Sequence, residues 1–314
     1  MKRLFVIFVC LLVSACKGGG FGTFFGGDAA EPSYADDADE NLTRGQESLD
    51  SKNYVEAQKY FDYVKSKYPY LEAATTAELK LGDVDFEREK YIEARDRYVN
   101  FAKLHPTHPK LDYAAFRAAL THYKDMPSDF FVLPPSVEKD QAEVRSASVA
   151  LADFIRNYPQ SSYVEEAKKA LDEVRRRLAG HELYVANFYK RRERWQAVVL
   201  RLNVVARDFG GLGYEEKVYF GLYDAYLKIQ STSQKKLELG QVELSKAQAV
   251  LAEVGDAATD AQKQKVTDAE LQIKEAENAL LSAQGKPEEV LKQLVERYPE
   301  TDAAKKAQSM LEKR

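Results

Sequence analysis

Two stretches of the sequence repeat each other and decide the fold. Residues 53–69 read NYVEAQKYFDYVKSKYP, and residues 90–106 read KYIEARDRYVNFAKLHP. When each stretch is extended toward the N-terminus, a glycine, an alanine, an aromatic residue and a proline recur with a shift of 37 residues. The matching pairs are Gly45 and Gly82, Ala57 and Ala94, Phe61 and Tyr98, and Pro69 and Pro106. A repeat of this length indicates tandem supersecondary units that bury their apolar faces against one another.

The spacing within each unit resembles the tetratricopeptide pattern. Steps of 12, 4 and 8 residues separate the glycine, the alanine, the aromatic residue and the proline. Glycine and alanine fit where the two helices of a hairpin cross closely, and the aromatic residue lies one turn further along the same face. The proline ends the second helix because it cannot continue the helical hydrogen bonds. Each unit is therefore predicted to be a pair of packed helices.

Three further units continue this frame less regularly. In the third, a first helix at residues 112–124 is followed by an insertion, MPSDFFVLPP, at residues 126–135. The fifth opens at Gly221 and closes at Pro299, and a capping helix follows Thr301. We therefore predict an all-α fold, an α-solenoid of about five helical hairpins. The other positions of the frame are Ala119, Ala147, Leu151, Pro159, Ala186, Val198, Leu202, Gly210 and Leu291.

A long polar segment with its own periodicity interrupts the fifth unit. Residues 237–254 and 266–283 carry apolar or small side chains at alternating steps of three and four, the spacing of a coiled-coil seam. Gly255 breaks the pattern between them, and Thr259 with Gln262 forms a capping-box signature. We predict an antiparallel coiled-coil hairpin, which is either a partner-binding arm or a decoration without a partner.

The N-terminus has the pattern of a secretory signal peptide. Two basic residues precede an apolar run at residues 4–13, which is too short to cross a bilayer of ~30 Å as a helix. The LVSAC sequence at residues 12–16 resembles a bacterial lipobox, and this resemblance implies cleavage before Cys16 and a covalent lipid on its sulfur. An ordinary signal peptide that ends at a chance cysteine is the alternative. Since Cys10 lies inside the apolar run, the processed chain would keep one cysteine and form no disulfide.

These patterns divide the chain into five parts. Residues 1–15 are the lipoprotein signal peptide, and residues 16–40 are a flexible tether, because glycine-rich and then acidic sequence cannot bury a core. Residues 41–232 are the tetratricopeptide repeats as far as the first helix of the fifth unit. Residues 233–286 are the coiled-coil hairpin, and residues 287–314 are the end of the fifth unit and the capping helix.

Nothing in the sequence indicates catalysis, a metal or a further cofactor. The net charge of −4 argues against nucleic acid as a partner. His105 and His108 share a proline-rich turn without the spacing of metal ligands, so we expect them to shape that turn. The sequence has no G-x-S-x-G, Walker or dinucleotide-binding motif. We therefore expect a protein that is not an enzyme and that acts by holding other proteins.

Four motifs in a fixed order resemble the BamD family, lipoproteins of the outer-membrane β-barrel assembly machinery. LHPTHPKLDY at residues 104–113 resembles the family's NPTHPxxDY turn, and RLAGHELYVANFY at residues 177–189 resembles its RLAxxExxVAxYY helix. WQAVVLR at residues 195–201 resembles WxAVVxR. Residues 130 and 131 resemble a GFF stretch, although Asp129 replaces the glycine. The hairpin insertion lies outside the resemblance.

The resemblance implies a lipid-anchored scaffold on the periplasmic face of the outer membrane. Its expected partners are the POTRA domains of a BamA-type insertase, unfolded outer-membrane proteins and other assembly lipoproteins. Arg201 matches the family arginine that pairs with an acidic residue on BamA, and Trp195 belongs to the same motif. Arg201 also precedes the core position Leu202, so it should leave the packed face. A pair with an acidic residue of a neighbouring helix is the alternative for Arg201.

Client peptides with apolar and aromatic side chains would suit a groove lined by tyrosines. The candidates are Tyr60, Tyr63, Tyr113 and Tyr123, for which packing between helices is the competing interpretation.

Two other protein classes stay open as alternatives. One is a Tol-Pal coordinator, in which the coiled coil precedes the repeats instead of interrupting the last one. The other is a lytic transglycosylase, which requires a catalytic Glu in an appended domain, and no stretch is left over to form one.

Overall fold

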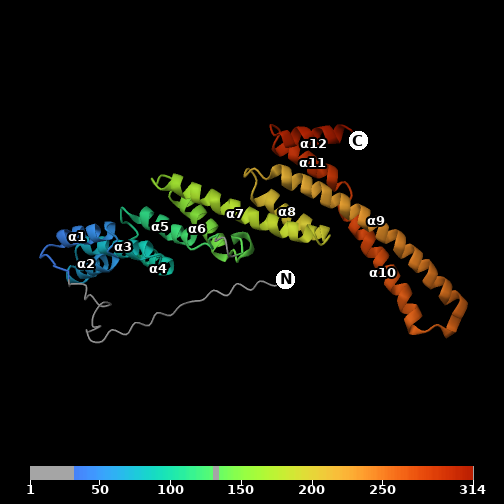
Figure 1. The fold of residues 1–314 in the computed structure, drawn as a ribbon, viewed down its shortest axis with the longest axis horizontal. Coiled ribbons are helices and arrows are strands. Elements are labelled where there is room, and N and C mark those ends of the chain that lie inside the picture. Colours follow the sequence, from blue (N-terminus) through green and yellow to red (C-terminus); the bar gives the residue numbers. More distant parts are fainter. Residues whose placement is uncertain (1–31, 130–133, 314) are drawn as a thin grey trace, which may run out of the picture. The chain divides into compact units, whose positions relative to one another are not determined.

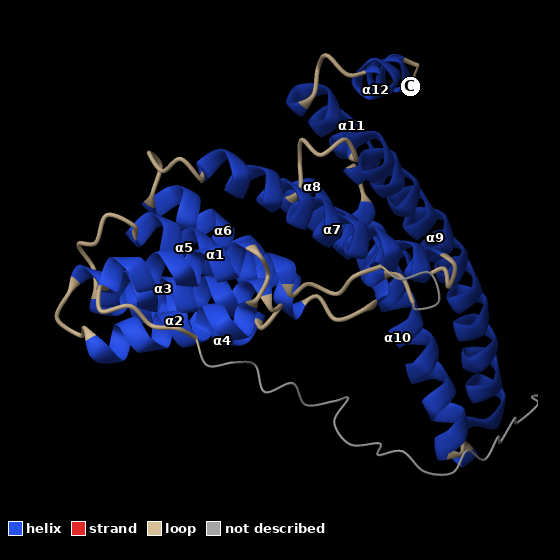
Figure 2. Ribbon diagram, turned by 60° about the vertical axis from the view of Figure 1, so that its left-hand side comes forward, coloured by secondary structure: helices blue, strands red, loops and turns tan. Residues whose placement is uncertain are grey.

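The computed structural model of the chain describes residues 32–129 and 134–313, and the regular structure within them is helical. Figure 2 shows helices joined by loops throughout this part of the chain. The predicted all-α fold of helical hairpins is confirmed. The chain divides into two compact units, Met1–Ala74 and Thr75–Arg314.

The first unit contains one helical hairpin, α1 (Ala38–Asp50) with α2 (Tyr54–Lys67). Asp37 caps α1, because its carboxylate accepts the backbone N–H of Glu40 at 2.8 Å. The predicted C-terminal boundary of the flexible tether, residue 40, is therefore too far along the chain, because α1 already begins at Ala38. Residues 33–36 also contact α1 and α2 through hydrogen bonds that the sequence did not suggest.

The second compact unit continues with helices that pack each against the next along the chain (Figure 1). They are α3 (Glu72–Glu87), most of which belongs to this unit, α4 (Tyr91–Leu104), α5 (Leu111–Lys124), α6 (Ala142–Asn157), α7 (Val164–Lys190) and α8 (Trp195–Asp208). Where Pro106 and Pro159 stand, the preceding helix has already ended, as the frame predicts.

Close approach of the two helices in a hairpin explains the small residues of the frame. A Cβ atom added to Gly45 would lie 2.7 Å from Phe61 Cε1, and one added to Gly82 would lie 2.8 Å from Tyr98 Cε1. The aromatic side chain of the second helix thus rests on the glycine of the first. Gly221 makes a close approach between consecutive hairpins instead, because a Cβ atom added to it would lie 2.9 Å from Leu202 Cδ1 of the preceding unit.

The fifth unit and the insertion share one helix. Helix α9 (Glu215–Val254) runs unbroken from the repeat into the hairpin, so the predicted boundary at residue 233 falls inside it. Helix α10 (Asp260–Ala283) returns beside it after the break at residues 255–259 (Figures 1 and 2). Helices α11 (Lys286–Arg297) and α12 (Asp302–Glu312) then complete the unit, with α11 against α9 and α12 against α11. None of the described helices is long and apolar enough to span a membrane.

The coiled-coil hairpin has the seam that its periodicity predicts. Gly240 is buried, and a Cβ atom added to it would lie 3.0 Å from Ile273 Cγ1 on the other helix. Ala269 is buried at the same seam, whereas Leu271, two positions away, is 56% exposed. The capping box that was predicted to begin the second arm, at Thr259, is also present.

We expect Gly82→Ala to lower the free energy of unfolding by about 1–3 kcal/mol, the usual cost of overpacking a core. The new methyl group would press on a tyrosine ring that is itself buried. Gly180→Ala is the matched control, because its Cβ atom would lie an ordinary 3.5 Å from Val137 Cγ1. It should stabilise α7 by up to about 1 kcal/mol. Urea unfolding of both variants measures the difference, and equal stability would contradict the close-packing argument.

Excision of residues 236–277, with a short glycine-containing turn in their place, should preserve cooperative unfolding. The base of the hairpin stays intact in this variant, including the hydrogen bond from Gln230 Nε2 to the Ala283 carbonyl at 2.8 Å. A larger excision of residues 233–286 is the matched control. It removes Ala283, which is fully buried in the core of the fifth unit, and should lower the melting temperature. If the small excision also abolished cooperative melting, the outer arm would have to support the repeats.

Candidate partner-binding site

Arg201 lies on α8 and is held by a carboxylate of the preceding helix. Its Nη1 donates to Glu182 Oε2 on α7 at 3.1 Å. The Arg201 side chain is nevertheless 41% exposed, whereas that of Glu182 is 17% exposed. The structure therefore confirms that Arg201 leaves the packed face and shows the internal pair that was its alternative. One edge of the guanidinium is fixed, and the exposed remainder is oriented toward solvent.

Partly exposed apolar residues precede and follow this arginine on α8. Leu200, its neighbour, is 68% exposed. Ala197 and Val204 stand four residues before and three residues after Arg201, so they share its face of α8, and both are half-buried. An oriented arginine among partly exposed apolar residues has the composition of a protein–protein contact, since arginine is enriched there and most other charged residues are depleted.

Trp195 does not join Arg201 at this site. The tryptophan packs against the core that α7, α8 and α9 share, and it borders a surface groove together with Lys190, Asp224 and Leu227. Arg201 does not line this groove. Because the two residues are six positions apart on one helix, they face different directions. The shared sequence motif thus combines an anchor for the fold with a separate surface residue.

The tyrosines predicted to line a client groove have partners within the chain. In the first unit, Tyr60 is only 6% exposed, and Tyr63 stacks on the ring of Tyr34 with 4.0 Å between centroids. Tyr34 belongs to the segment that was expected to be a flexible tether. A short extended segment has no periodicity, so this contact could not be predicted from the sequence.

In the second compact unit, Tyr113 belongs to a buried polar network. The hydroxyls of Tyr113 and Tyr98 both donate to Asp83 Oδ1 at 2.7 Å. Arg117 lies 3.8 Å from the same carboxylate, and its guanidinium carbon lies 3.7 Å from the centroid of the Phe86 ring. Burial, followed by the Asp83 charge, raises the pKa of Tyr113. Packing between helices thus accounts for this tyrosine.

Tyr123 has a separate internal partner. Its hydroxyl donates to Glu173 Oε2 on α7 at 2.5 Å. Burial and this carboxylate together raise the pKa of Tyr123 to about 12. The residue therefore connects α5 to α7, which is again a packing role.

The histidines form contacts between side chains or with the backbone. His105 Nε2 lies 2.9 Å from Glu78 Oε2, and His181 Nδ1 lies 2.6 Å from the Val137 carbonyl oxygen. His122 lies between Arg95 and Glu143. Across residues 32–129 and 134–313, no three His, Cys, Asp or Glu side chains are grouped to hold a metal ion.

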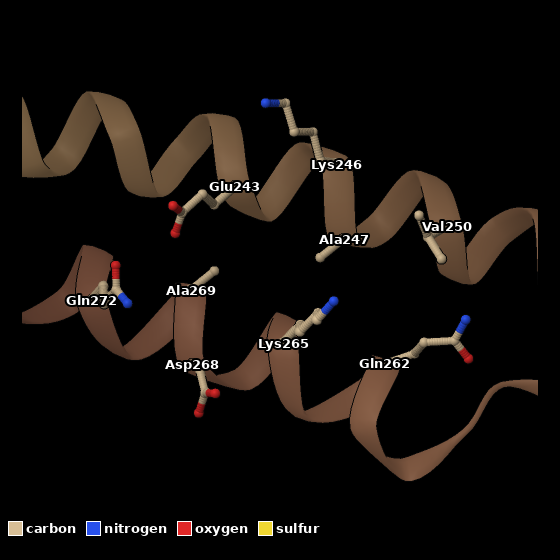
Figure 3. Close-up of a pocket in the computed structure, with 9 residues that line it drawn as sticks. All are labelled: Glu243, Lys246, Ala247, Val250, Gln262, Lys265, Asp268, Ala269 and Gln272. Atoms are coloured by element: carbon tan, nitrogen blue, oxygen red, sulfur yellow. The ribbon is translucent and has the colours of Figure 1, made fainter.

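A groove runs between the two helices of the coiled-coil hairpin (Figure 3). Ala247 and Ala269 point into the space between the helices, which exists because alanines leave room that larger side chains would fill. Apart from the apolar Val250, the other lining side chains are charged or carry amides: Glu243, Lys246, Gln262, Lys265, Asp268 and Gln272. Charged side chains beside an apolar seam are typical of a coiled-coil flank.

Two parts of the predicted site lie outside the described residues. They are Cys16, the predicted lipid attachment point, and residues 130 and 131 of the insertion. A hydrogen bond spans the insertion: the Asp129 carboxylate accepts the backbone N–H of Ser136 at 2.6 Å, which lowers the pKa of this aspartate.

Curated relatives of this chain carry one common name. Outer membrane protein assembly factor BamD of Caulobacter vibrioides is 28% identical over 192 residues, which cover 61% of this chain and 60% of the relative. The protein of the same name from Neisseria meningitidis serogroup B is 28% identical over 189 residues, 59% of this chain and 70% of the relative. That of Haemophilus influenzae is 25% identical, with 74% and 86% covered. This chain thus spans about three fifths of the Caulobacter protein's length.

A solved structure with the same kind of repeat also aligns. The tetratricopeptide-repeat protein of Bacteroides fragilis is 14% identical, and the alignment covers 89% of this chain and 99% of that one with a TM-score of 0.41.

The family model of the YfiO outer membrane lipoproteins matches residues 34–239, more than half of the 314 residues. The match starts in the segment that contacts α2, includes Arg201 and ends within the coiled-coil hairpin. It confirms the resemblance that the four motifs indicated. The chain belongs to the YfiO family of outer membrane lipoproteins.

Proposed function

We propose that this protein is a lipid-anchored, non-catalytic scaffold of the outer-membrane β-barrel assembly complex. It binds the periplasmic POTRA domains of a BamA-type insertase, receives unfolded barrel clients and acts beside other assembly lipoproteins. The observation that carries this proposal is the family membership over residues 34–239, together with relatives named as assembly factors. A repeat array suits the role because each hairpin adds surface without a catalytic centre.

The contact with the insertase is assigned to the Arg201 face of α7 and α8. Glu182 orients the guanidinium without covering it, so less side-chain freedom is lost when a partner binds. An arginine can form two parallel hydrogen bonds with an acidic residue of that partner. Ala197 and Val204, on the same face of α8, supply apolar area, which the partner would remove from water.

Affinity purification of the tagged protein from outer membranes tests the function directly. A BamA-type insertase in the eluate supports the proposal, whereas recovery of Pal in its place would favour a cell-envelope coordinator. Turnover of peptidoglycan by the purified protein would favour a transglycosylase and contradict the scaffold proposal.

Arg201→Glu should weaken binding to purified POTRA domains by roughly 2–5 kcal/mol, the range for a broken, desolvated charge pair. The charge-swapped variant Arg201→Glu with Glu182→Arg separates the two roles of the arginine. The swap restores the internal pair but presents the opposite charges to the partner. We expect the single variant to lose some stability, and the swapped variant to regain stability without regaining affinity. Calorimetric binding and thermal melting provide both readouts.

Arg156→Glu is the matched control for the charge change. Arg156 is 73% exposed and pairs with Asp153 of its own helix, away from the proposed contact. Its replacement should leave affinity within about twofold, because exposed pairs contribute little. If the swapped variant bound POTRA domains normally, Arg201 would serve the fold alone and the site assignment would fail.

Cys16→Ala should release the protein from the outer membrane while leaving the repeats folded. Two or more acyl chains provide the stable anchoring that one chain does not. Because a bound insertase would also retain the protein, the variant is best combined with Arg201→Glu. Flotation of membranes on a detergent-free gradient measures the effect. If the double variant still floated with the outer membrane, the anchor would not be the lipid.

A further inference from the structure

Residues 33–36, the strap, lie along a set of side chains that contact either its backbone or its tyrosine ring. These side chains, the tyrosine face, are Asn41 and Arg44 of α1, Tyr60 and Tyr63 of α2, and Tyr68 just after α2. All of them lie in the first compact unit, together with the strap.

The hydrogen bonds to the strap reach its backbone. Asn41 is fully buried; its Nδ2 donates to the Ala35 carbonyl at 2.8 Å, and its Oδ1 accepts the Ala35 N–H at 3.0 Å. This pairing gives Ala35 the two bonds that a neighbouring β-strand would give it. Tyr68 Oη donates to the Asp36 carbonyl at 2.7 Å. The Ser33 carbonyl accepts from Arg44 and, at 3.3 Å, from Tyr60 Oη.

One side chain of the strap is recognised as well. The ring of Tyr34 stacks on Tyr63, with an angle of 12° between the planes, and meets Tyr60 edge-on at 5.7 Å between centroids. Main-chain hydrogen bonds combined with one side-chain contact are how proteins bind extended peptides of varied sequence. The chemistry of the tyrosine face therefore fits any extended segment with an aromatic residue in the place of Tyr34.

We propose that the strap is a built-in competitor for extended, aromatic-bearing segments of unfolded barrel proteins. This inference rests on the proposed function, because it takes those clients as the ligands. Strands of membrane β-barrels are extended and carry girdles of aromatic residues, so they offer the groups that the strap offers. The strap has the advantage of high effective concentration, since it is joined directly to α1.

Competition of this kind makes a quantitative prediction. When an internal segment occupies a site for most of the time, the apparent association constant of an external ligand is its intrinsic value multiplied by the fraction of sites that are open. Weakening the strap without altering the tyrosine face must then tighten binding of the external peptide. Weakening the face itself must loosen it.

The test uses the full chain and a fluorescein-labelled peptide of the last strand of an outer-membrane β-barrel, with fluorescence anisotropy as the readout. Tyr34→Ala removes the stacked ring from the strap and should tighten peptide binding by roughly two- to tenfold, the factor that an aromatic pair contributes. Tyr34→Phe keeps the ring and should bind as the unaltered chain does. In Tyr34→Ala with Tyr63→Ala, the gain should disappear because the face has lost its own ring.

A second strap variant guards against misfolding of the first. Ala35→Pro removes the N–H that Asn41 accepts while leaving the tyrosine face intact, so it should also tighten peptide binding. An unlabelled peptide of residues 31–37, EPSYADD, should displace the labelled peptide from both strap variants. Helix content from circular dichroism should stay unchanged in each.

Two outcomes overturn the inference. Peptide affinity that stays the same or falls in both Tyr34→Ala and Ala35→Pro means that the strap does not compete. Absence of peptide binding in every variant means that the tyrosine face is not a client site. POTRA binding, measured on the same samples, is assigned to the other compact unit and should not change. If the unaltered chain did not bind POTRA domains, that result would count against the proposed function instead.

Discussion

The whole array depends on how closely two helices approach within each hairpin. At Gly45 and Gly82 there is no room for even a methyl group, because a ring from the second helix lies against the backbone of the first. Deleting a large buried aromatic side chain typically costs 3–5 kcal/mol, so this one contact accounts for much of a hairpin's stability. The glycine, the alanine and the ring recur at fixed steps in the first two hairpins because both use the same packing geometry.

Such contacts explain why the fold was predictable from the sequence. Close packing restricts residue type at positions set by helical geometry, and it therefore leaves a period in the sequence. The coiled-coil seam is visible for the same reason: Gly240 and Ala269 are small where the helices meet, and Leu271 is exposed where they do not. The boundary at residue 233 was misplaced because α9 passes through it, and a continuous helix leaves no break between two periodic patterns.

The candidate sites were less predictable because their contacts have no period. The position of Arg201 next to the core residue Leu202 was enough to predict that it lies off the core. Its pairing with Glu182, however, depends on how α7 and α8 cross. The strap was interpreted as tether because acidic, glycine-flanked sequence resembles disordered sequence. A single buried amide, that of Asn41, provides two of the hydrogen bonds that order it. One polar residue in an amphipathic helix does not by itself predict that an extended segment binds to it.

The buried network around Asp83 shows how a repeated position acquires a local requirement. Where the first hairpin has Phe61, the second has Tyr98, whose hydroxyl is buried and needs an acceptor. Asp83 supplies it from the residue after Gly82, and Lys80, at 3.2 Å, and Arg117 offset its charge. Because Tyr113 also donates to Asp83, this carboxylate joins α3, α4 and α5. The hydroxyl that Tyr98 has and Phe61 lacks also accepts from Arg117 Nε at 3.2 Å, so the tyrosine couples the second hairpin to the third.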